Sequence, residues 1–343
     1  MTKQTELAEL GEFGLISKLT KKISTTRKST IYGIGDDCAV LSKTKQNYSL
    51  ITTDLLMEGI HFDLTFTPLK HLGYKAVTVN LSDIFAMNGT PEHITVSIAV
   101  SAKFTVEALE ELYEGIALAC ETYSVDLIGG DTSASLTGLA ISVTAVGSVQ
   151  PKLITYRNNA QINDLICVSG NLGAAYTGLQ IMQREKSVFQ QSKGAQPQLE
   201  GYEYIIQRYL KPEARADVIK NLADASITPT AMIDISDGLS SELFHICSQS
   251  NVGCKIYEEH IPIHQNTKNT VQEFNIEPII PALNGGEDYE LLFTVPIEQH
   301  EQIAKIPDVH IIGSITEKEK GLNMISRSGS PITIKAQGWS AFD

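Results

Sequence analysis

The sequence predicts a protein of two domains, the first α+β and the second α/β. Its 343 residues are enough for two domains of ordinary size. In the first half, the apolar patterns give strands and helices in the order ββαβαββ, which is an α+β pattern rather than a strict βαβ alternation. Gln150-Pro151-Lys152 then forms a natural break. We therefore expect an N-terminal domain at 1–150 and a C-terminal domain at 151–343.

Apolar spacing predicts the elements of the first half. Strands are expected at 29–41, 48–56, 93–101, 125–128 and 138–149, and helices at 69–88 and 105–123. Gly89 and Pro91 follow the first of these helices, and both residue types stop a helix. The second helix is strongly amphipathic, with Val106, Leu109 and Leu112 on one face.

The second half alternates strands with helices. Strands are expected at 164–169, 231–235, 253–257, 289–295 and 310–315, and helices at 202–210, 212–225, 239–249 and 297–305, with another directly after Gly173. Pro212 suits the first turn of a helix, where a backbone N–H would have no partner. The 187–200 segment is rich in Gln, Ser and Gly, which predicts a mobile loop.

The composition is typical of a soluble globular protein. Apolar residues make up 42% of the chain and charged residues 20%. The formal net charge of −13 argues against nucleic acid or an anionic membrane surface as a partner. An anionic nucleotide stays compatible with it, because metal ions can invert the local field. No apolar stretch reaches the roughly 18 residues of a membrane span.

The cysteines and the N-terminus predict a cytoplasmic protein. Five cysteines are scattered through apolar runs without zinc-ligand spacing, so we expect reduced and mostly buried thiols. Cys38 adjoins an acidic segment, which leaves a catalytic thiol as a minor alternative. Residues 1–12 are polar and acidic and lack the apolar core of a signal peptide.

Six short segments end an apolar run with an acidic residue set among Gly, Ser or Thr. They lie at 33–37, 52–54, 81–83, 129–131, 234–238 and 285–288. Carboxylates that stand where elements end can converge in space, and convergent carboxylates repel one another. Mg²⁺ prefers oxygen ligands and commonly serves phosphate chemistry, so it is the natural counter-charge. Taken singly, each segment also fits an ordinary turn or helix cap.

Three of these segments carry more specific expectations. Asp83 and Asn80 are three residues apart on one face of a largely apolar helix, where an acid needs a compensating partner. The Gly-Gly-Asp-Thr-Ser run at 129–133 is typical of a loop that approaches a phosphate. Strand alternation puts Asp234 and Ser236 on one side, and Asp237 is expected to cap the helix that follows.

Other signatures are absent or ambiguous. The chain has no P-loop, no protein-kinase motif set and no Gly-x-Ser-x-Gly elbow. The Gly-Asn-Leu-Gly run at 170–173 lacks the Rossmann pattern and is interpreted as a strand–helix turn. A lone histidine such as His61 is more often structural than functional. Glu287 either receives a substrate donor or merely begins a strand.

In their order along the chain, the motifs resemble those of the thiamine-monophosphate kinases. The matching stretches are GIGDDCA at 33–39, TTDLLMEGIHF at 52–62, VNLSDIFAMNG at 79–89, GGDT at 129–132, SDGL at 236–239 and GGEDYEL at 285–291. They span nearly the whole chain. The wider superfamily resembled includes aminoimidazole ribonucleotide synthetase and selenophosphate synthetase.

The resemblance implies a fold and a reaction. The fold is the two-domain, aminoimidazole ribonucleotide synthetase-like one. Its N-terminal mixed-sheet domain forms a homodimer, and its C-terminal α/β domain completes the nucleotide and substrate site. The reaction is ATP-dependent phosphorylation of thiamine monophosphate to thiamine diphosphate, the last step of thiamine diphosphate biosynthesis, with ATP as co-substrate and several Mg²⁺ ions.

The resemblance also implies roles for individual residues. The positions that match the family's Mg²⁺ ligands are Asp37, Thr52, Thr53, Asp54, Asp83, Asp131, Asp234 and Asp237. Those that match its ATP contacts are Gly130, Asp131, Arg157, Ser236 and Tyr113. His61, Glu287 and Trp339 match its substrate-binding positions, and a tryptophan can stack on a cationic heteroaromatic ring.

The expected chemistry is direct transfer between phosphates. The acceptor phosphate is already anionic, so we expect no general base, no nucleophile and no phosphoenzyme. Two alternatives remain at this point. One is aminoimidazole ribonucleotide or selenophosphate synthesis, the latter usually with a reactive Cys or Sec near the N-terminus, whereas no cysteine precedes Cys38 here. The other is a non-catalytic metal- or nucleotide-binding module.

Overall fold

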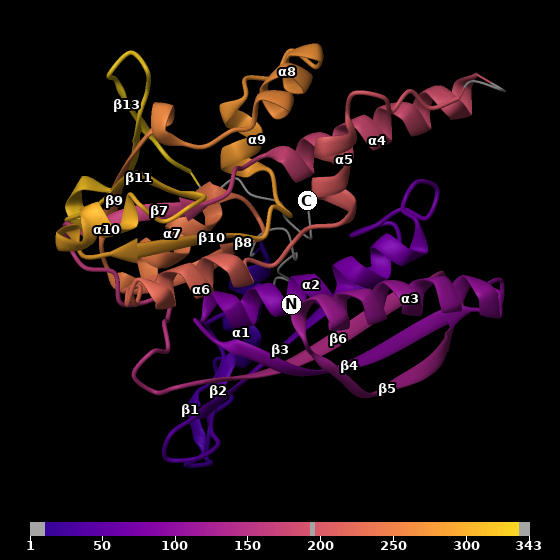
Figure 1. The fold of residues 1–343 in the computed structure, drawn as a ribbon, viewed down its shortest axis with the longest axis horizontal. Helices are drawn as coiled ribbons and strands as arrows, with labels where there is room; N and C mark the ends of the chain where they lie inside the picture. The colour runs from indigo at the N-terminus through magenta and orange to yellow at the C-terminus, as the bar shows by residue number, and fades with distance from the viewer. Residues whose placement is uncertain (1–10, 193–195, 336–343) are drawn as a thin grey trace, which may run out of the picture.

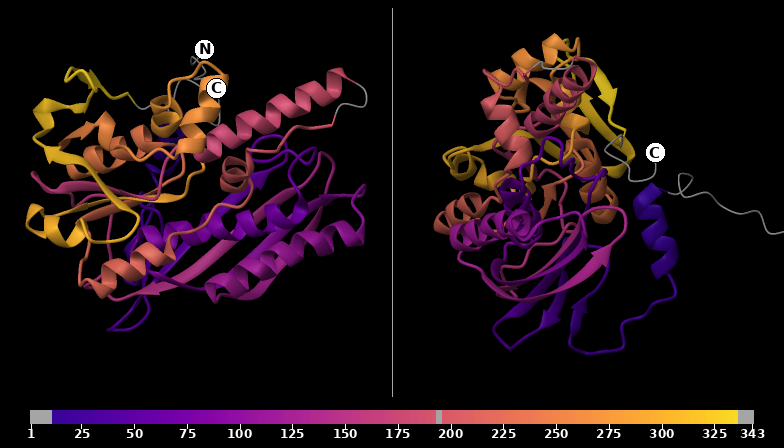
Figure 2. Two further views of the ribbon diagram at one scale, coloured as in Figure 1. Left: turned by 45° about the horizontal axis from the view of Figure 1, so that its top comes forward. Right: turned by 90° about the vertical axis from the view of Figure 1, so that its right-hand side faces the viewer.

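Two β-sheets, one from each half of the chain, face each other with helices between and around them (Figure 1). The computed structural model describes residues 11–192 and 196–335. Figure 2 shows that helix α1 (Gly11–Thr20) stands beside the N-terminal sheet, apart from the other helices of that half.

The first sheet has six strands in the order β1-β2-β3-β6-β4-β5. The strands are β1 (Thr30–Tyr32), β2 (Ala39–Ser42), β3 (Tyr48–Met57), β4 (Thr90–Ser101), β5 (Asp126–Ser135) and β6 (Ala140–Val149). Only the β4–β5 pair is parallel among the pairs of this sheet, so the sheet is mixed. Helices α2 (Leu69–Ala86) and α3 (Val106–Tyr123) cover one face of it (Figure 1).

Two predictions for the first half were wrong in detail. The strand expected at 29–41 is two short antiparallel strands, β1 and β2, because the chain turns at Gly35, whose φ is +127°. The Gly-Gly-Asp run expected to form a phosphate loop lies inside β5, which pairs with β4 along its whole length. A Cβ on Gly130 would meet the Val96 carbonyl oxygen at 1.9 Å, so this glycine permits close strand pairing.

The second sheet has seven strands in the order β13-β12-β9-β11-β7-β10-β8. They are β7 (Leu165–Ser169), β8 (Ala231–Ile235), β9 (Gly253–Tyr257), β10 (Glu290–Val295), β11 (Val309–Thr316), β12 (Leu322–Ile325) and β13 (Pro331–Thr333). The helices of this half are α4 (Ala174–Gln191), α5 (Glu203–Leu210), α6 (Ala216–Asp224), α7 (Leu239–Ser250), α8 (Gln265–Glu273), α9 (Ile279–Asn284) and α10 (His300–Ile303). Strands β7, β8 and β10 are buried on both faces, with α7 residues packed on one side and α6 and α10 residues on the other.

The second half also departs from prediction in two places. Helix α4 continues through Gln191, so the first part of the expected loop at 187–200 is helical. Helix α6 begins at Ala216, which leaves Pro212 outside it. The reason lies in tertiary contacts: Tyr74 and Tyr123 donate hydrogen bonds to the Glu213 carboxylate at 2.6 and 2.8 Å, which hold this segment out of helical conformation. Helices α1, α8 and α9 and strands β12 and β13 were not predicted, since they are short or weakly patterned.

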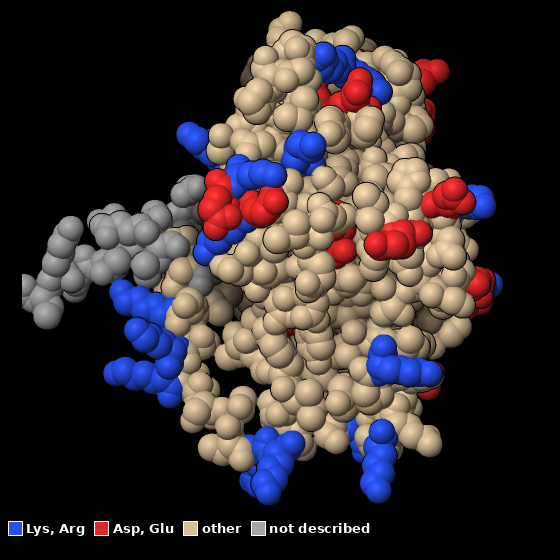
Figure 3. All heavy atoms as spheres, turned by 90° about the vertical axis from the view of Figure 1, so that its left-hand side faces the viewer, with Lys and Arg blue, Asp and Glu red and all other residues tan. Residues whose placement is uncertain are grey.

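Charged side chains are unevenly spread over one face of the molecule. On the face shown in Figure 3, Lys and Arg side chains gather along the lower and left edges, while acidic side chains are found mainly higher up. Within the described residues, no helix is both long and apolar enough to cross a membrane.

Helix α2 is buried between the two halves. Leu72, Ile84 and Val77 join the core of the first half, whereas Ala86 packs with Phe293 in the core of the second. A helix with apolar residues on opposite faces needs other elements packed against both of those faces. Polar side chains of α2 can therefore face the junction of the two sheets, which is where the candidate site lies.

Helices α2 and α3 touch through their backbones. A Cβ on Gly73 would meet the Leu112 carbonyl oxygen at 2.0 Å, and a Cβ on Gly115 would meet the Lys70 carbonyl oxygen at 1.9 Å. The two glycines face each other's helix, so the axial position of α2 against α3 is fixed at two points.

We expect Gly73→Ala to lower the free energy of unfolding by about 1–3 kcal/mol, because the added methyl group forces the helices apart. In a helix without this contact the same change would raise stability by about 1 kcal/mol. Chemical denaturation of wild type and variant measures the difference. Glu110→Ala, a change at an exposed position of α3, is the control. A Gly73→Ala variant as stable as the control would contradict the contact.

Candidate active site

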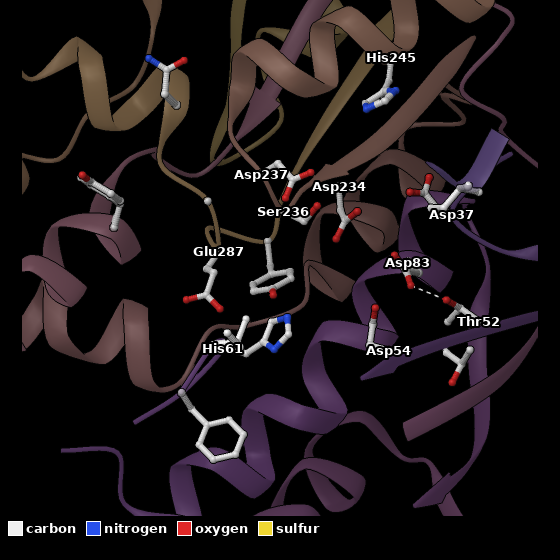
Figure 4. A pocket seen from close by; sticks show the side chains of 18 of the residues that line it. Asp37, Thr52, Asp54, His61, Asp83, Asp234, Ser236, Asp237, His245 and Glu287 are labelled. Atoms are coloured by element: carbon white, nitrogen blue, oxygen red, sulfur yellow. Dashed lines mark hydrogen bonds between the residues drawn. The ribbon is translucent and has the colours of Figure 1, made fainter. Parts of the chain in front are cut away.

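A cavity of about 890 Å³ lies at the junction of the two halves. Its walls come from β3 and the loop before β2, from α2, from the end of β8, from the segment before β10 and from α1. Helix α1 contributes Ile16, Ser17 and Thr20. Most of the aspartates that the sequence marked out line one part of this cavity, and Figure 4 shows how five of them point toward one another: Asp37, Asp54, Asp83, Asp234 and Asp237.

Three carboxylates from three separate elements converge. Asp37 follows β1, Asp83 lies on α2 and Asp234 lies on β8, and one oxygen from each lies within 4.8 Å of the others. Two hydroxyls hold them: Thr52 donates to Asp83 at 2.5 Å, and Ser82 donates to Asp234 at 2.6 Å. The expected convergence of Asp37, Asp83 and Asp234 is therefore present in the structure.

Burial and mutual repulsion disfavour the charged forms of these groups. Burial, followed by the nearby Asp54 and Asp234 carboxylates, raises the pKa of Asp83 well above its usual range. Burial and the Asp37 carboxylate raise the pKa of Asp234 to about 7. A cation is the group that would relieve both effects.

The donor set fits Mg²⁺. The oxygens of three carboxylates lie together with the Thr52 hydroxyl, and such hard ligands are those that Mg²⁺ takes. Oδ2 of Asp37 is buried, and no hydrogen-bond partner for it is found among the described residues. A buried carboxylate oxygen without a donor is a natural metal ligand.

Arg157 supplies part of the counter-charge. Its guanidinium pairs with Asp37, and its backbone N–H donates to Asp36 at 3.2 Å. The other oxygen of Asp36 accepts the backbone N–H of Asp37 at 3.0 Å, so Asp36 shapes the turn that presents Asp37. Arg157 lines the cavity, and its described ion-pair partners are the carboxylates of Asp36 and Asp37.

Asp54 and Thr53 also line the cavity beside the carboxylates. The backbone N–H of Asp54 donates to Asn80 Oδ1 at 3.0 Å, while Asp83 of the same helix meets Thr52. Asn80 and Asp83 thus share the face of α2 that turns toward β3, as their spacing predicted. Thr53 donates its hydroxyl to the Val143 carbonyl oxygen at 3.1 Å.

The turn after β8 differs from the prediction in its cap. Gly238, with φ of +123°, is the residue before α7, so the expectation that Asp237 caps this helix was wrong. The turn is held instead by Glu242, whose Oε1 accepts the backbone N–H groups of Ser236 at 3.1 Å and Asp237 at 2.8 Å. The side chains of Ser236 and Asp237 both line the cavity.

His61 and Glu287 line another part of the cavity (Figure 4). His61 Nδ1 accepts the backbone N–H of Met57 at 3.0 Å, and burial lowers the pKa of His61, which favours the neutral ring. Glu287 has φ of +69°, and its N–H donates to the Ser236 carbonyl oxygen at 2.7 Å. The segment that carries Glu287 is thereby tied to the turn that carries Ser236.

Three predicted site residues that the structure describes do not line this cavity, and a fourth lies outside the described part of the chain. Gly130, Asp131 and Tyr113 are not among the residues that line it. Gly130 and Asp131 are exposed on β5, and Tyr113 packs against the core of the first half. Trp339 lies outside the residues that the structure describes.

Cys38 is not suited to be a catalytic thiol. It is buried, and burial together with the surrounding aspartates raises its pKa well above the usual range. Its backbone N–H donates to the sulfur of Met87 at 3.1 Å, so its position is that of a core residue.

Sequence reasoning missed several residues of the site. Glu242 stands in the first turn of α7, where an acid next to a buried apolar face was a usable signal. Tyr209 and Tyr289 line the cavity but had no local signal, because each reaches it through the packing of distant segments.

We expect the metal-free protein to lose stability as the pH rises from about 4 to about 7. The pKa values of Asp36 and Asp234 lie at about 7 in the folded chain, against about 3.9 when unfolded, so the folded state binds more protons across this window. Mg²⁺ needs the deprotonated groups, so its stabilising effect should grow with pH.

Thermal melts in EDTA and in excess MgCl₂, taken at about pH 5.5 and about pH 8, measure both effects. Asp234→Asn should flatten the slope in EDTA. A Tm in EDTA that rises across this window would contradict the assignment.

Family models match both halves of the chain. Residues 35–149 match the N-terminal domain of the AIR synthase related proteins, and residues 161–323 match their C-terminal domain.

Characterised relatives are similar over nearly the full length. A thiamine-monophosphate kinase of Buchnera aphidicola subsp. Schizaphis graminum is 37% identical, covering 97% of this chain and 99% of its own length. One from Aquifex aeolicus is 34% identical and covers 98% and 99%. A solved structure described as AaThiL complexed with AMPPCP and TMP superimposes with a TM-score of 0.84 at 33% identity, covering 99% of this chain and 100% of that one.

Proposed function

Because the chain belongs to the thiamine-monophosphate kinases among the AIR synthase related proteins, we propose that it moves the γ-phosphoryl group of ATP directly onto thiamine monophosphate. The products are thiamine diphosphate and ADP. The observation that carries the proposal is the convergence of Asp37, Asp83 and Asp234 on a cavity open to both halves. The related structure with AMPPCP, an ATP analogue, and TMP supports the same pair of substrates.

The carboxylate cluster would hold Mg²⁺ through Asp37, Asp83 and Asp234, with Thr52, Thr53, Asp54 and Asp237 at the edge of the same part of the cavity. Bound Mg²⁺ neutralises phosphate charge and helps to align the two substrates. The hydroxyls of Thr52 and Ser82 keep two of the carboxylates in place before any ion arrives.

No proton transfer by the protein is needed for the chemical step. The acceptor oxygen belongs to a phosphate that is already ionised, so positioning and electrostatics supply the catalysis. Arg157 and Ser236 lie beside the carboxylates, where they can bind the phosphates of ATP. His61 and Glu287 line the other part of the cavity, which we call the acceptor end because we propose that it receives thiamine monophosphate. Transfer is direct, so a labelled phosphoprotein trapped during turnover would contradict it.

We expect Asp237→Asn to lower kcat by at least about 100-fold, the size typical of losing one group that supports transition-state charge. The fold should persist, because Glu242 and Gly238 rather than Asp237 hold the turn. Thiamine diphosphate formation is assayed by chromatography, and circular dichroism checks folding. Asp224→Asn, an exposed change on α6, is the control. Full activity in Asp237→Asn would remove this residue from the metal site.

We also propose that the chain is a homodimer that joins through β5. This strand is exposed over nearly its whole length, stands at the edge of its sheet and bears the exposed Leu127 and Ile128. A long, exposed edge strand normally needs a cover. If the domains divide at 150/151, the first domain alone would form the dimer. The free cysteines suit a cytoplasmic location.

The dimer gives Gly130 and Asp131 a role. Asp131 lies three strands away from Asp54 across the sheet order β3-β6-β4-β5, about 14 Å at ordinary strand spacing, so both cannot hold one ion within a chain. At an interface through β5, Asp131 instead faces a second copy. We propose that it completes the partner's site.

Mixing two inactive variants tests this arrangement. Asp131→Asn and Asp237→Asn chains, mixed in equal amounts and allowed to exchange, should recover about a quarter of wild-type activity, because half of the dimers are mixed and one of their two sites has both residues intact. Neither variant alone should turn over. No recovery, with exchange confirmed by mass spectrometry, would show that each chain builds its site alone.

A further inference from the structure

Helix α2 places a buried lysine against the acceptor end of the cavity. The Lys75 side chain is 3% exposed, and its Nζ lies 2.8 Å from Glu287 Oε1. Nζ also donates to the Tyr209 carbonyl oxygen at 3.4 Å and lies 4.6 Å from the centre of the Tyr209 ring. A carboxylate, a carbonyl oxygen and an aromatic face together replace the water that a buried ammonium group loses.

Lys75 is not itself a wall of the cavity, whereas both of its partners are. Glu287 and Tyr209 line the cavity, and Figure 4 shows Glu287 beside His61 there. Lys75 comes from the first half of the chain and its partners from the second. Any effect of this lysine on a bound molecule must therefore pass through Glu287 or Tyr209.

The backbone around Glu287 is already constrained. Glu287 and Tyr289 have φ of +69° and +51°, values that side-chain-bearing residues seldom adopt. Their N–H groups donate to the carbonyl oxygens of Ser236 at 2.7 Å and Ile235 at 2.9 Å. These bonds fix where the Glu287 side chain begins, but its rotatable bonds leave the carboxylate free to move. The ion pair with Lys75 fixes where it ends.

We propose that Lys75 is a positioning residue for the acceptor substrate: it holds the Glu287 carboxylate in one orientation and balances its charge. The inference rests on the proposed function. Apart from its phosphate, thiamine monophosphate has one N–H donor group, the amino group of its pyrimidine ring. A carboxylate fixed by Lys75 accepts from that group, and a carboxylate balanced by Lys75 does not attract a stray metal ion away from the aspartates.

A positioning role predicts an effect on one substrate alone. Lys75→Met keeps the apolar stem and removes the charge, so KM for thiamine monophosphate should rise about tenfold while KM for ATP changes less than about twofold. Lys75→Arg should recover part of the loss, since it can still pair with Glu287.

Lys211→Met is the matched control. Lys211 Nζ pairs with Glu213 at 3.0 Å and lies 4.3 Å from the centre of the Tyr74 ring, which is the same combination of carboxylate and aromatic face away from the cavity. It also joins the two halves. This variant should leave both KM values at the wild-type level.

A double variant separates positioning from folding. If Lys75 acts through Glu287, then Lys75→Met added to Glu287→Gln should leave KM for thiamine monophosphate where Glu287→Gln alone puts it. This comparison works even if Lys75→Met alone does not fold, because the double variant has no unpaired buried charge.

The outcomes are distinct. A wild-type chain that forms no thiamine diphosphate overturns the proposed function and, with it, this inference. With an active wild type, equal effects of Lys75→Met on both KM values, the same effects in Lys211→Met, or a further rise in the double variant would each overturn the positioning role alone.

Discussion

The repulsion among Asp37, Asp83 and Asp234 is the constraint on which the rest of the site depends. Three carboxylates with oxygens within 4.8 Å of one another, two of them buried and Asp83 partly buried, raise one another's proton affinity, so the fold must hold them together against their charge. Thr52, Ser82 and Arg157 do this in the free chain, each from a different part of the structure. A bound cation would relieve this repulsion, which is why we propose that the cluster holds Mg²⁺.

Helix α2 makes this concentration of charge possible. Its apolar residues pack against both sheets, and its polar ones, Asn80, Ser82, Asp83 and Lys75, are distributed between the carboxylate cluster and the acceptor end. One rigid element thus sets the separation between the groups that we propose to meet the nucleotide and those that we propose to meet the acceptor. Positioning of two substrates against each other is the main contribution that a protein can make to phosphoryl transfer.

Much of this arrangement could be predicted where the signal is local. The spacing of Asn80 and Asp83 predicted their shared face, and the acidic segments predicted the cluster. Asp237 was misassigned because Glu242 competes for the same backbone N–H groups and Gly238 takes the cap position. The Gly-Gly-Asp run looked like a loop, but an available edge on β4 draws it into a strand. Lys75 gave no signal, since a lysine in an apolar helix becomes informative only when Glu287, far along the chain, is seen beside it.

The contact between Gly73 and Gly115 has a mechanical consequence. With the backbones of α2 and α3 touching at two points, α2 cannot slide or roll against the first sheet without breaking that contact. The groups on α2 are therefore held in a fixed position relative to α3. We expect any opening of the cavity to involve the second half of the chain or α1, which lines the cavity with Ile16, Ser17 and Thr20. Because Asp83 lies on α2 and Asp234 on β8 of the second half, any movement of that half also changes the distance between two carboxylates of the cluster.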